Sequence, residues 1–203
     1  ASSPIEPPWP LDYMHGEALD ILPKVLDAIG FQRGLLLGHS DGASMAAIYA
    51  GGIQDHRVRG VALIAPHFIT EAIGLAAIAR TNDDYRSGVL KSKLARWHRD
   101  VDSTFDGWSG VWLDPAFRDW DISDYLAYIR VPVAILQGTD DQYGTMRQIE
   151  IAQEECYCPV DVTEVPGAGH SPHREAPGAT LDAISDFANA VLRDDAGSRG
   201  RAA

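Results

Sequence analysis

A serine, two aspartates and a histidine stand in three glycine-containing stretches that are far apart along the chain. Ser40 is the centre of GHSDG, Asp140 and Asp141 lie in GTDDQYG, and His170 lies in GAGHSPHREAP. A serine hydroxyl is barely ionised at neutral pH, so it needs an imidazole to accept its proton and a carboxylate to orient that imidazole. These residue types predict nucleophilic attack on a carbonyl, provided that the fold brings them together.

Short apolar runs of strand length precede all three stretches, and helical patterns lie between them. The predicted strands cover residues 35–37, 58–65, 131–137 and 160–165, and the intervening helices cover 43–50 and 145–154. This alternation predicts an α/β fold with a mostly parallel sheet flanked by helices, and the strands read as buried on both faces. Because the carboxyl ends of parallel strands share one edge, the three stretches are expected there.

Helices are also predicted at both ends of this array. Residues 17–29 have apolar side chains at helical spacing, with Pro23 expected to kink the helix and Gly30 to cap it. A last helix begins near Pro177 and should pack on the sheet through one apolar face, formed by Leu181, Ile184, Phe187, Val191 and Leu192. From about 194 to 203 no apolar period continues, which predicts a loose tail.

One connection is too long for an ordinary crossover. Residues 66–129 separate two predicted strands and contain four of the five tryptophans, Trp97, Trp108, Trp112 and Trp120. We interpret about 68–127 as a helical cap inserted into a single domain.

The pentapeptide around Ser40 fits the Gly-x-Ser-x-Gly elbow, in which glycines allow a sharp strand-to-helix turn that a Cβ would obstruct. The following helix directs its positive end at the serine, and the backbone N–H of Asp41 is placed to donate to an oxyanion. The same pentapeptide also occurs in ordinary glycine turns. The order Ser, Asp, His downstream of successive strands favours the elbow.

With these three motifs, the chain resembles the α/β-hydrolase fold family, close to its small cap-bearing esterases and carbon–carbon bond hydrolases, from about Met14 to Leu192. The resemblance implies that Ser40 is the nucleophile, His170 the general base and Asp141 the residue that orients the imidazole. Asp141 is preferred because the family's acid is usually the fourth residue counted from the glycine after the strand. Asp140 is then a loop-capping carboxylate, and the opposite assignment stays open.

Further side chains beside these positions have two interpretations. His173 is a rival to His170 but lacks the preceding glycine turn, which favours a packing role. For the others, packing is weighed against lining a substrate pocket, and both roles can hold together: His39, His67, Phe68, Trp108 and Trp112.

A serine nucleophile points to an acyl-enzyme that water hydrolyses, so the predicted function is a serine hydrolase of small carboxylic esters. Cleavage of a carbon–carbon bond in a vinylogous diketone uses the same residues and is an alternative, as is a non-catalytic ligand-binding remnant of the fold. Neither a metal nor an organic cofactor is called for, because the nucleophile, base and backbone dipoles cover what acyl transfer needs.

Composition and net charge indicate which classes of partner the protein binds. The chain has 203 residues, is 45% hydrophobic and carries a formal net charge of -12, which suits one sizeable core and argues against nucleic acid or membrane-surface binding. Small molecules are therefore the expected partners. Cys156 and Cys158 are too close together for a disulfide between them to stabilise the fold, and we predict that both are reduced thiols. Because the sequence shows neither an export leader nor a membrane span, we expect a cytoplasmic location.

The resemblance also has a gap. Family members carry further strands before the helix at residues 17–29, and the loop after the third of them supplies a second oxyanion donor. Their absence would leave the strand at residues 35–37 as a bare sheet edge and cost on the order of 100- to 1000-fold in turnover. We therefore expect either a longer native chain or a covering chain or homo-oligomer at this edge.

Overall fold

The computed structural model describes residues 8–199, with side chains described as far as Arg193. The chain divides into two compact units. The sheet unit comprises Met14–Ile69 and the chain from Asp121 onward, and the helical unit comprises Thr70–Trp120 with residues 8–13.

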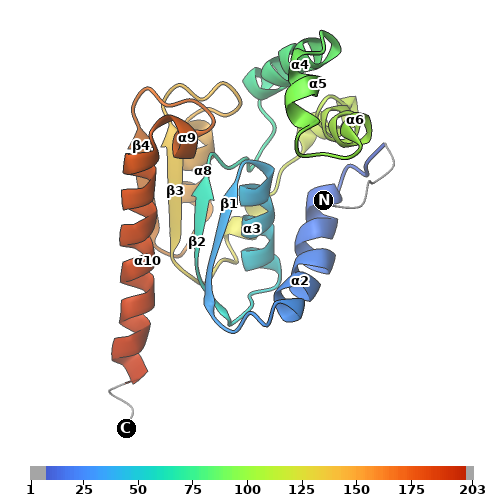
Figure 1. Ribbon diagram of the computed structural model, residues 1–203. Helices are drawn as coiled ribbons and strands as arrows, with labels where there is room; N and C mark the ends of the chain where they lie inside the picture. Colours follow the sequence, from blue (N-terminus) through green and yellow to red (C-terminus); the bar gives the residue numbers. More distant parts are fainter. Residues whose placement is uncertain (1–7, 200–203) are drawn as a thin grey trace. The chain divides into compact units, whose positions relative to one another are not determined.

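The sheet unit is built on four parallel strands (Figure 1). In spatial order they are β1 (Gly34–His39), β2 (Val58–Ile64), β3 (Val133–Gly138) and β4 (Val160–Val165). Each strand pairs with the next one along the chain, so their carboxyl ends meet at one edge of the sheet. The predicted α/β class and parallel pairing are confirmed.

Burial differs between inner and outer strands. Every residue of β3 is buried and all of β2 except Arg59, whereas β1 and β4 are mostly half-buried or exposed. The prediction that all strands are buried on both faces is therefore wrong for β1 and β4. The reason is their position, because β1 and β4 are the two edges of the described sheet.

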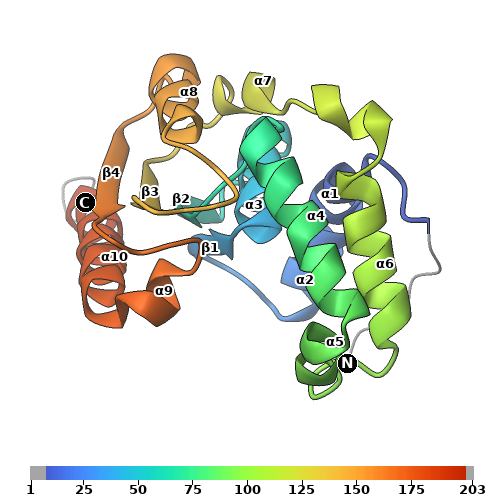
Figure 2. The same ribbon diagram turned by 90° about the horizontal axis from the view of Figure 1, so that it is seen from above.

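Helices cover both faces of this sheet. Figure 2 shows α3 (Asp41–Gly52) and α8 (Arg147–Glu155) on one side and α10 (Pro177–Arg199) on the other. On that second side Phe187 packs with Ala62 and Ala134, while Ile184 contacts Ile64 and Leu136. The short α9 (Pro172–Glu175) precedes α10.

Two details of α10 differ from expectation. Leu181 and Leu192 were predicted on the packing face but are exposed, and for Leu192 the reason is that it is one residue, or 100° of helix, beyond Val191. Helix α10 also continues to Arg199, so the tail predicted from about 194 is helical up to there. Apolar periodicity marks only the packed face of a helix, and main-chain hydrogen bonds extend a helix beyond that face without an apolar period. Residues 200–203 lie outside the described part.

The amino-terminal helix is continuous but irregular. Short α1 (Tyr13–His15) leads into a π-helical segment, η1 (Gly16–Ile21), which is followed by α2 (Leu22–Ala28). Pro23 lies in the first turn of α2, where its missing N–H accounts for the widened turn before it. Gly30 has a φ of 69° and ends the helix, as predicted.

A polar cluster joins the loops at the amino ends of β1 and β2. The Arg57 guanidinium donates to Asp55 at 2.7 Å and to Asp27 of α2 at 2.7 Å, and it also reaches the Phe31 carbonyl at 3.2 Å. The Tyr49 hydroxyl of α3 donates to Asp55 at 2.6 Å. Asp55 therefore ties α3 to β2, and Arg57 extends the connection to α2.

The helical unit contains α4 (Ala72–Arg86), α5 (Val89–Leu94), α6 (Val101–Trp112) and the 3-10 helix η2 (Pro115–Asp119). Aromatic rings form its interior: Tyr85 stacks on Phe105 at 3.8 Å, and Trp112 meets Phe117 edge-on at 4.9 Å. This unit is narrower than the predicted 68–127, because α7 (Ser123–Leu126) belongs to the sheet unit.

None of the helices described within residues 8–199 combines the length and apolarity that a membrane crossing requires. No cluster of three or more His, Cys, Asp or Glu side chains in that range is arranged to hold a metal ion. Cys156 and Cys158 carry free thiols between α8 and β4.

Candidate active site

Ser40 occupies the turn between β1 and α3 in a strained conformation. Its φ of 54° and ψ of -126° are rarely adopted by a residue with a side chain. The preceding Gly38 is required, since a Cβ there would lie 2.2 Å from the carbonyl oxygen of Gly42. At Gly42 a Cβ would meet nothing within 4 Å, so the close approach explains only the first glycine of the motif.

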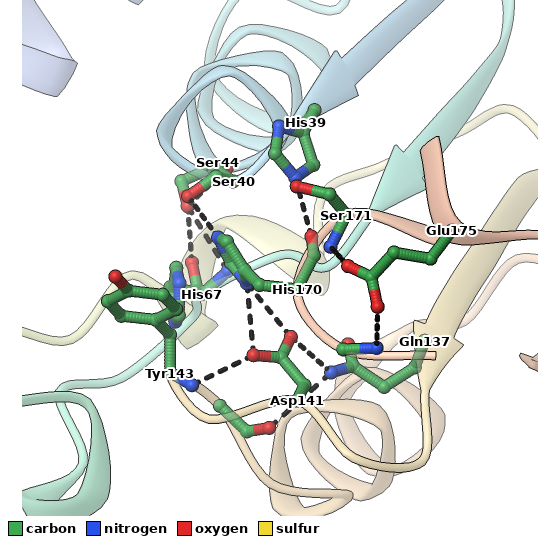
Figure 3. A network of polar contacts seen from close by, with 12 residues as sticks. His39, Ser40, Ser44, His67, Gln137, Asp141, Tyr143, His170, Ser171 and Glu175 are labelled. Atoms are coloured by element: carbon green, nitrogen blue, oxygen red, sulfur yellow. Dashed lines mark hydrogen bonds and ion pairs between the residues drawn. The ribbon is translucent and has the colours of Figure 1, made fainter. Parts of the chain in front are cut away.

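The strands bring the three predicted side chains into one chain of contacts (Figure 3). His170 Nε2 lies 2.9 Å from Ser40 Oγ, and His170 Nδ1 lies 2.9 Å and 3.0 Å from the two carboxylate oxygens of Asp141. These residues are 130 and 29 positions apart in sequence. The distance from Ser40 Oγ to His170 Nε2 and the distances from His170 Nδ1 to the Asp141 carboxylate are all within hydrogen-bond range. Side chains in this arrangement can act as a nucleophile, a base and an acid that orients the base.

Asp140 is placed differently from Asp141. Its backbone N–H donates to the Ala168 carbonyl at 2.9 Å, and its side chain is exposed, 3.4 Å from Thr139 Oγ1. Of the two aspartates, the structure thus brings Asp141 to His170. Asp140 instead links the loop after β3 to the loop that carries His170.

The Asp141 carboxylate is enclosed, with its side chain 1% exposed, and receives further hydrogen bonds. The backbone N–H of Tyr143 donates at 2.8 Å and the Gln137 side-chain amide donates at 2.8 Å. Burial by itself raises the pKa of Asp141, but the hydrogen bonds from His170, Tyr143 and Gln137 outweigh it, and the pKa lies below the usual value. Asp141 is therefore ionised at neutral pH.

The backbone around His170 is held from two directions (Figure 3). The Glu175 carboxylate accepts from the N–H of Gly169 at 2.7 Å and from the N–H of Ser171 at 3.1 Å. On the other side, the His39 ring Nε2 lies 2.7 Å from the carbonyl oxygen of His170, and it must be the donor because the carbonyl only accepts. Helix α9 begins here and places Glu175 one turn after Ser171.

Three more histidines surround this centre. The His39 ring lies 5.0 Å from the ring of His170 and 4.7 Å from that of His173, centre to centre. Burial lowers the pKa of His39. His39 thus has the hydrogen bond and ring contacts of a packing residue, and the ring of His173 packs against the ring of His39.

His67 lies just beyond β2, with its ring centre 5.5 Å from that of His170. Its carbonyl accepts from Ser44 Oγ at 2.6 Å. Burial is the main reason that the pKa of His67 falls to about 3, so the ring is neutral at physiological pH. The neighbouring Phe68 is fully buried, and its N–H donates to Gln148 Oε1 at 2.7 Å.

The remaining predicted pocket residues, Trp108 and Trp112, lie on α6 of the helical unit. Trp112 is buried against Phe117 and Trp120, and Trp108 contacts Phe105 with ring centres 5.8 Å apart. Core packing is thus observed for Trp112. Substrate contact by either tryptophan stays a prediction.

Asp41, the predicted source of an oxyanion donor, is the first residue of α3. Its N–H belongs to the first turn of α3, where the helix dipole favours negative charge. The position next to Ser40 therefore suits stabilisation of a negative oxygen.

Sequence patterns did not single out Gln137 or Glu175 as part of this site. A signal for Gln137 exists, because an amide inside an otherwise apolar strand requires a buried partner. Glu175 follows His170 by five residues in a stretch with proline on either side, which gives no indication of a contact with the histidine loop.

The sequence model of the alpha/beta hydrolase family matches residues 3–183 of the chain. No curated protein sequence gives a significant match.

Solved structures with the same fold include enzymes with esterase names. A carboxylesterase structure from Nitrososphaera gargenis has 18% identity and a TM-score of 0.69, covering 89% of this chain and 73% of that chain. An esterase from Rhodococcus has 18% identity and a TM-score of 0.66, covering 91% and 75%. A hydrolase from Pseudomonas aeruginosa has 21% identity and a TM-score of 0.65, covering 92% and 75%. At these identities the likeness shows the fold, and because the family model spans most of the sequence, the chain belongs to the alpha/beta hydrolase family.

Proposed function

We propose that the protein is a serine hydrolase that cleaves small carboxylic esters through an acyl-enzyme formed on Ser40. The observation that carries this proposal is the continuous contact from Ser40 Oγ through the His170 ring to the Asp141 carboxylate. A serine alone is a weak nucleophile, and this arrangement supplies both the base and its orientation. The esterase names of the structural neighbours favour an ester as the bond that is cleaved.

In the proposed first half-reaction, Ser40 Oγ attacks the ester carbonyl carbon while its proton moves to His170 Nε2, 2.9 Å away. Asp141 stabilises the resulting imidazolium through Nδ1–H. The tetrahedral intermediate collapses by breaking the carbon–oxygen bond to the alcohol, which leaves with the proton from His170.

In the second half-reaction, water takes the place of the alcohol. His170 accepts a proton from this water as the water oxygen attacks the acyl carbon, and the proton then passes to Ser40 Oγ when the acid is released. The two half-reactions together consume one water and yield one acid and one alcohol, with Ser40 and His170 restored.

The negative oxygen of each tetrahedral intermediate requires donors placed in advance. We assign one donor to the N–H of Asp41 at the start of α3. The second donor is proposed to come from a polypeptide segment that covers the open side of β1. Without it, turnover is expected to be on the order of 100- to 1000-fold lower than with both donors.

An organophosphonate that reacts with activated serines tests the proposal directly. The full chain should gain the mass of one phosphonyl group, and peptide mapping should place this group on Ser40. The matched variant Ser40→Ala should stay unlabelled and lose hydrolysis of aryl esters by at least about 1000-fold, because the acyl-enzyme is proposed to form on Ser40 Oγ.

Parallel assays distinguish the alternatives. Turnover of a vinylogous diketone that exceeds turnover of the aryl ester would replace the ester assignment with carbon–carbon bond cleavage. If the folded chain is neither labelled nor active on either substrate but binds a small apolar ligand, the protein is a non-catalytic member of the fold.

A further inference from the structure

Gln137 is a buried polar side chain that lies behind the proposed catalytic acid. It is the penultimate residue of β3, only 1% exposed, and four positions before Asp141. Its Nε2 donates to Asp141 Oδ2 at 2.8 Å and reaches the Gly144 carbonyl at 3.4 Å (Figure 3). The amide therefore contacts the carboxylate oxygen that also faces His170 Nδ1.

The orientation of this amide is determined by its neighbours. If Nε2 and Oε1 were exchanged, an amide oxygen would face the Asp141 carboxylate and the Gly144 carbonyl, and three acceptors would be brought together. In the observed orientation both N–H bonds point at acceptors. In this orientation the amide oxygen, Oε1, is buried and has no hydrogen-bond partner among the residues that the structure describes.

An unpaired buried carbonyl costs stability, and a methionine of similar size would fill the same space without that cost. Fold stability by itself therefore does not explain a glutamine here. A second buried glutamine in the sheet unit shows the contrast. Gln148 uses both ends of its amide, since Oε1 accepts from the N–H of Phe68 at 2.7 Å and Nε2 donates to the Ile69 carbonyl at 3.0 Å.

We propose that Gln137 is a positioning residue that holds the Asp141 carboxylate in the orientation and charge state needed to orient His170. This inference rests on the proposed function for its kinetic consequence but not for its structural one. With the Tyr143 N–H on one carboxylate oxygen and Gln137 on the other, the carboxylate cannot rotate away from Nδ1 without breaking a hydrogen bond. Removing the Gln137 amide leaves one of these two restraints.

The test compares Gln137→Met with Gln148→Met in the full chain. For Gln137→Met we expect kcat on an aryl ester to fall about tenfold with KM unchanged within about twofold, the loss expected for one hydrogen bond to a charged group. Its thermal midpoint should stay within about 3 °C of the wild type, because the lost hydrogen bond is offset by removal of the unpaired carbonyl. Gln148→Met should lower the midpoint further, because it loses paired groups only.

A measurement independent of turnover is the exchange of the His170 Nδ1 proton with water, followed by ¹⁵N-edited NMR. This exchange should accelerate in Gln137→Met and be unchanged in Gln148→Met. If Gln137→Met does not fold, Gln137→Asn provides the same comparison, since the amide is retained but is one methylene too short to reach Asp141.

The outcomes separate the two proposals. Unchanged kcat and unchanged proton exchange in the Gln137 variants would overturn the positioning role, and so would an activity loss that merely follows a loss of stability. If the wild type is not labelled at Ser40 yet the Nδ1 proton exchanges faster in Gln137→Met, the hydrolase proposal fails while the positioning role stands.

Discussion

At the scale of single residues, the candidate site depends on groups that hold backbone and carboxylate in place. Ser40 is strained at a φ of 54°, and Ala65, at the end of the adjacent β2, also has a positive φ of 47°. Such conformations persist only when the surrounding contacts enforce them. Here the Ser40 N–H donates to the Ile64 carbonyl at 2.9 Å, and the Ala65 N–H donates to the Leu136 carbonyl at 2.9 Å. The ladder hydrogen bonds of the sheet thus stabilise both strained residues.

The two neighbouring aspartates make opposite predictions. Asp141→Asn should reduce kcat by about 1000- to 10,000-fold, because an amide facing Nδ1 disfavours the tautomer in which Nε2 accepts the serine proton. Asp140→Asn should change kcat by no more than about twofold, since its side chain is exposed and does not contact His170. Steady-state kinetics of the two variants under identical conditions provide the measurement. Equal losses in both would show that the acid is wrongly assigned.

At the scale of elements, the stability of the sheet unit depends on the end opposite the site as well. Asp55 connects Tyr49 of α3 with Arg57, the residue before β2, and Arg57 reaches Asp27 of α2. Hydrogen bonds from Arg57 hold the pKa of Asp55 well below its usual range, although burial opposes them. Burial and the hydrogen bond to Asp55 raise the pKa of Tyr49 to about 12.

These shifts predict a pH window for stability. The folded Asp55 binds its proton more weakly than the unfolded one, so its contribution is complete above the unfolded pKa of about 4 and is lost as the pH falls below it. Tyr49 determines the stability at high pH, because the unfolded phenol ionises near pH 10 while the folded phenol stays protonated there. Its contribution is therefore lost as the pH rises from 10 toward 12.

The variant Asp55→Asn should lower the free energy of unfolding by about 2 kcal/mol at pH 7, as expected for lost hydrogen bonds to a charged group. The difference from the wild type should shrink below pH 4. Urea unfolding at pH 7 and pH 3 measures both values. A constant difference at the two pH values would contradict the assignment of the low pKa to Asp55.

At the scale of the whole molecule, the open side of β1 is a conspicuous apolar feature of the sheet unit. The Ser40 N–H donates to Ile64, so by alternation the N–H and C=O of Leu35 and Leu37 point away from β2. Leu37 is 57% exposed. A groove of about 260 Å³ runs beside it, with an apolar lining that includes Ile21, Leu22, Val25, Leu36 and Met45. Unpaired edges of this kind attract another strand.

We propose that the 203-residue chain associates with itself through this edge. Leu37→Lys should shift the population toward the monomer, because a charged side chain on an edge strand opposes pairing. Sedimentation at several concentrations gives the mass of each species. The matched control is Ile53→Lys, in which another exposed apolar residue, at the carboxyl end of α3, is changed instead of one on β1. Identical masses for wild type and Leu37→Lys would contradict association through β1.

The sequence by itself determined the parallel order of strands and helices, the glycine-flanked turn at Ser40 and the order in which serine, aspartate and histidine follow their strands. These features are readable because periodicity, glycine and helix caps act over a few neighbouring residues. The sequence patterns did not predict every local irregularity, and the π-helical turn before Pro23 is an example.

Only the tertiary structure decided which aspartate meets His170, that β4 is the second edge of the sheet beside the predicted edge at β1, and that Gln137 and Glu175 hold the acid and the histidine loop. Asp140 and Asp141 are adjacent and chemically identical, and the packing of β3 against β4 with its following loop selects one of them. Gln137 has an apolar strand as its sequence context, and the carboxylate that explains it is brought there by the turn after β3. Contacts between residues such as Ser40 and His170, 130 positions apart, arise from strand pairing, for which no local pattern exists.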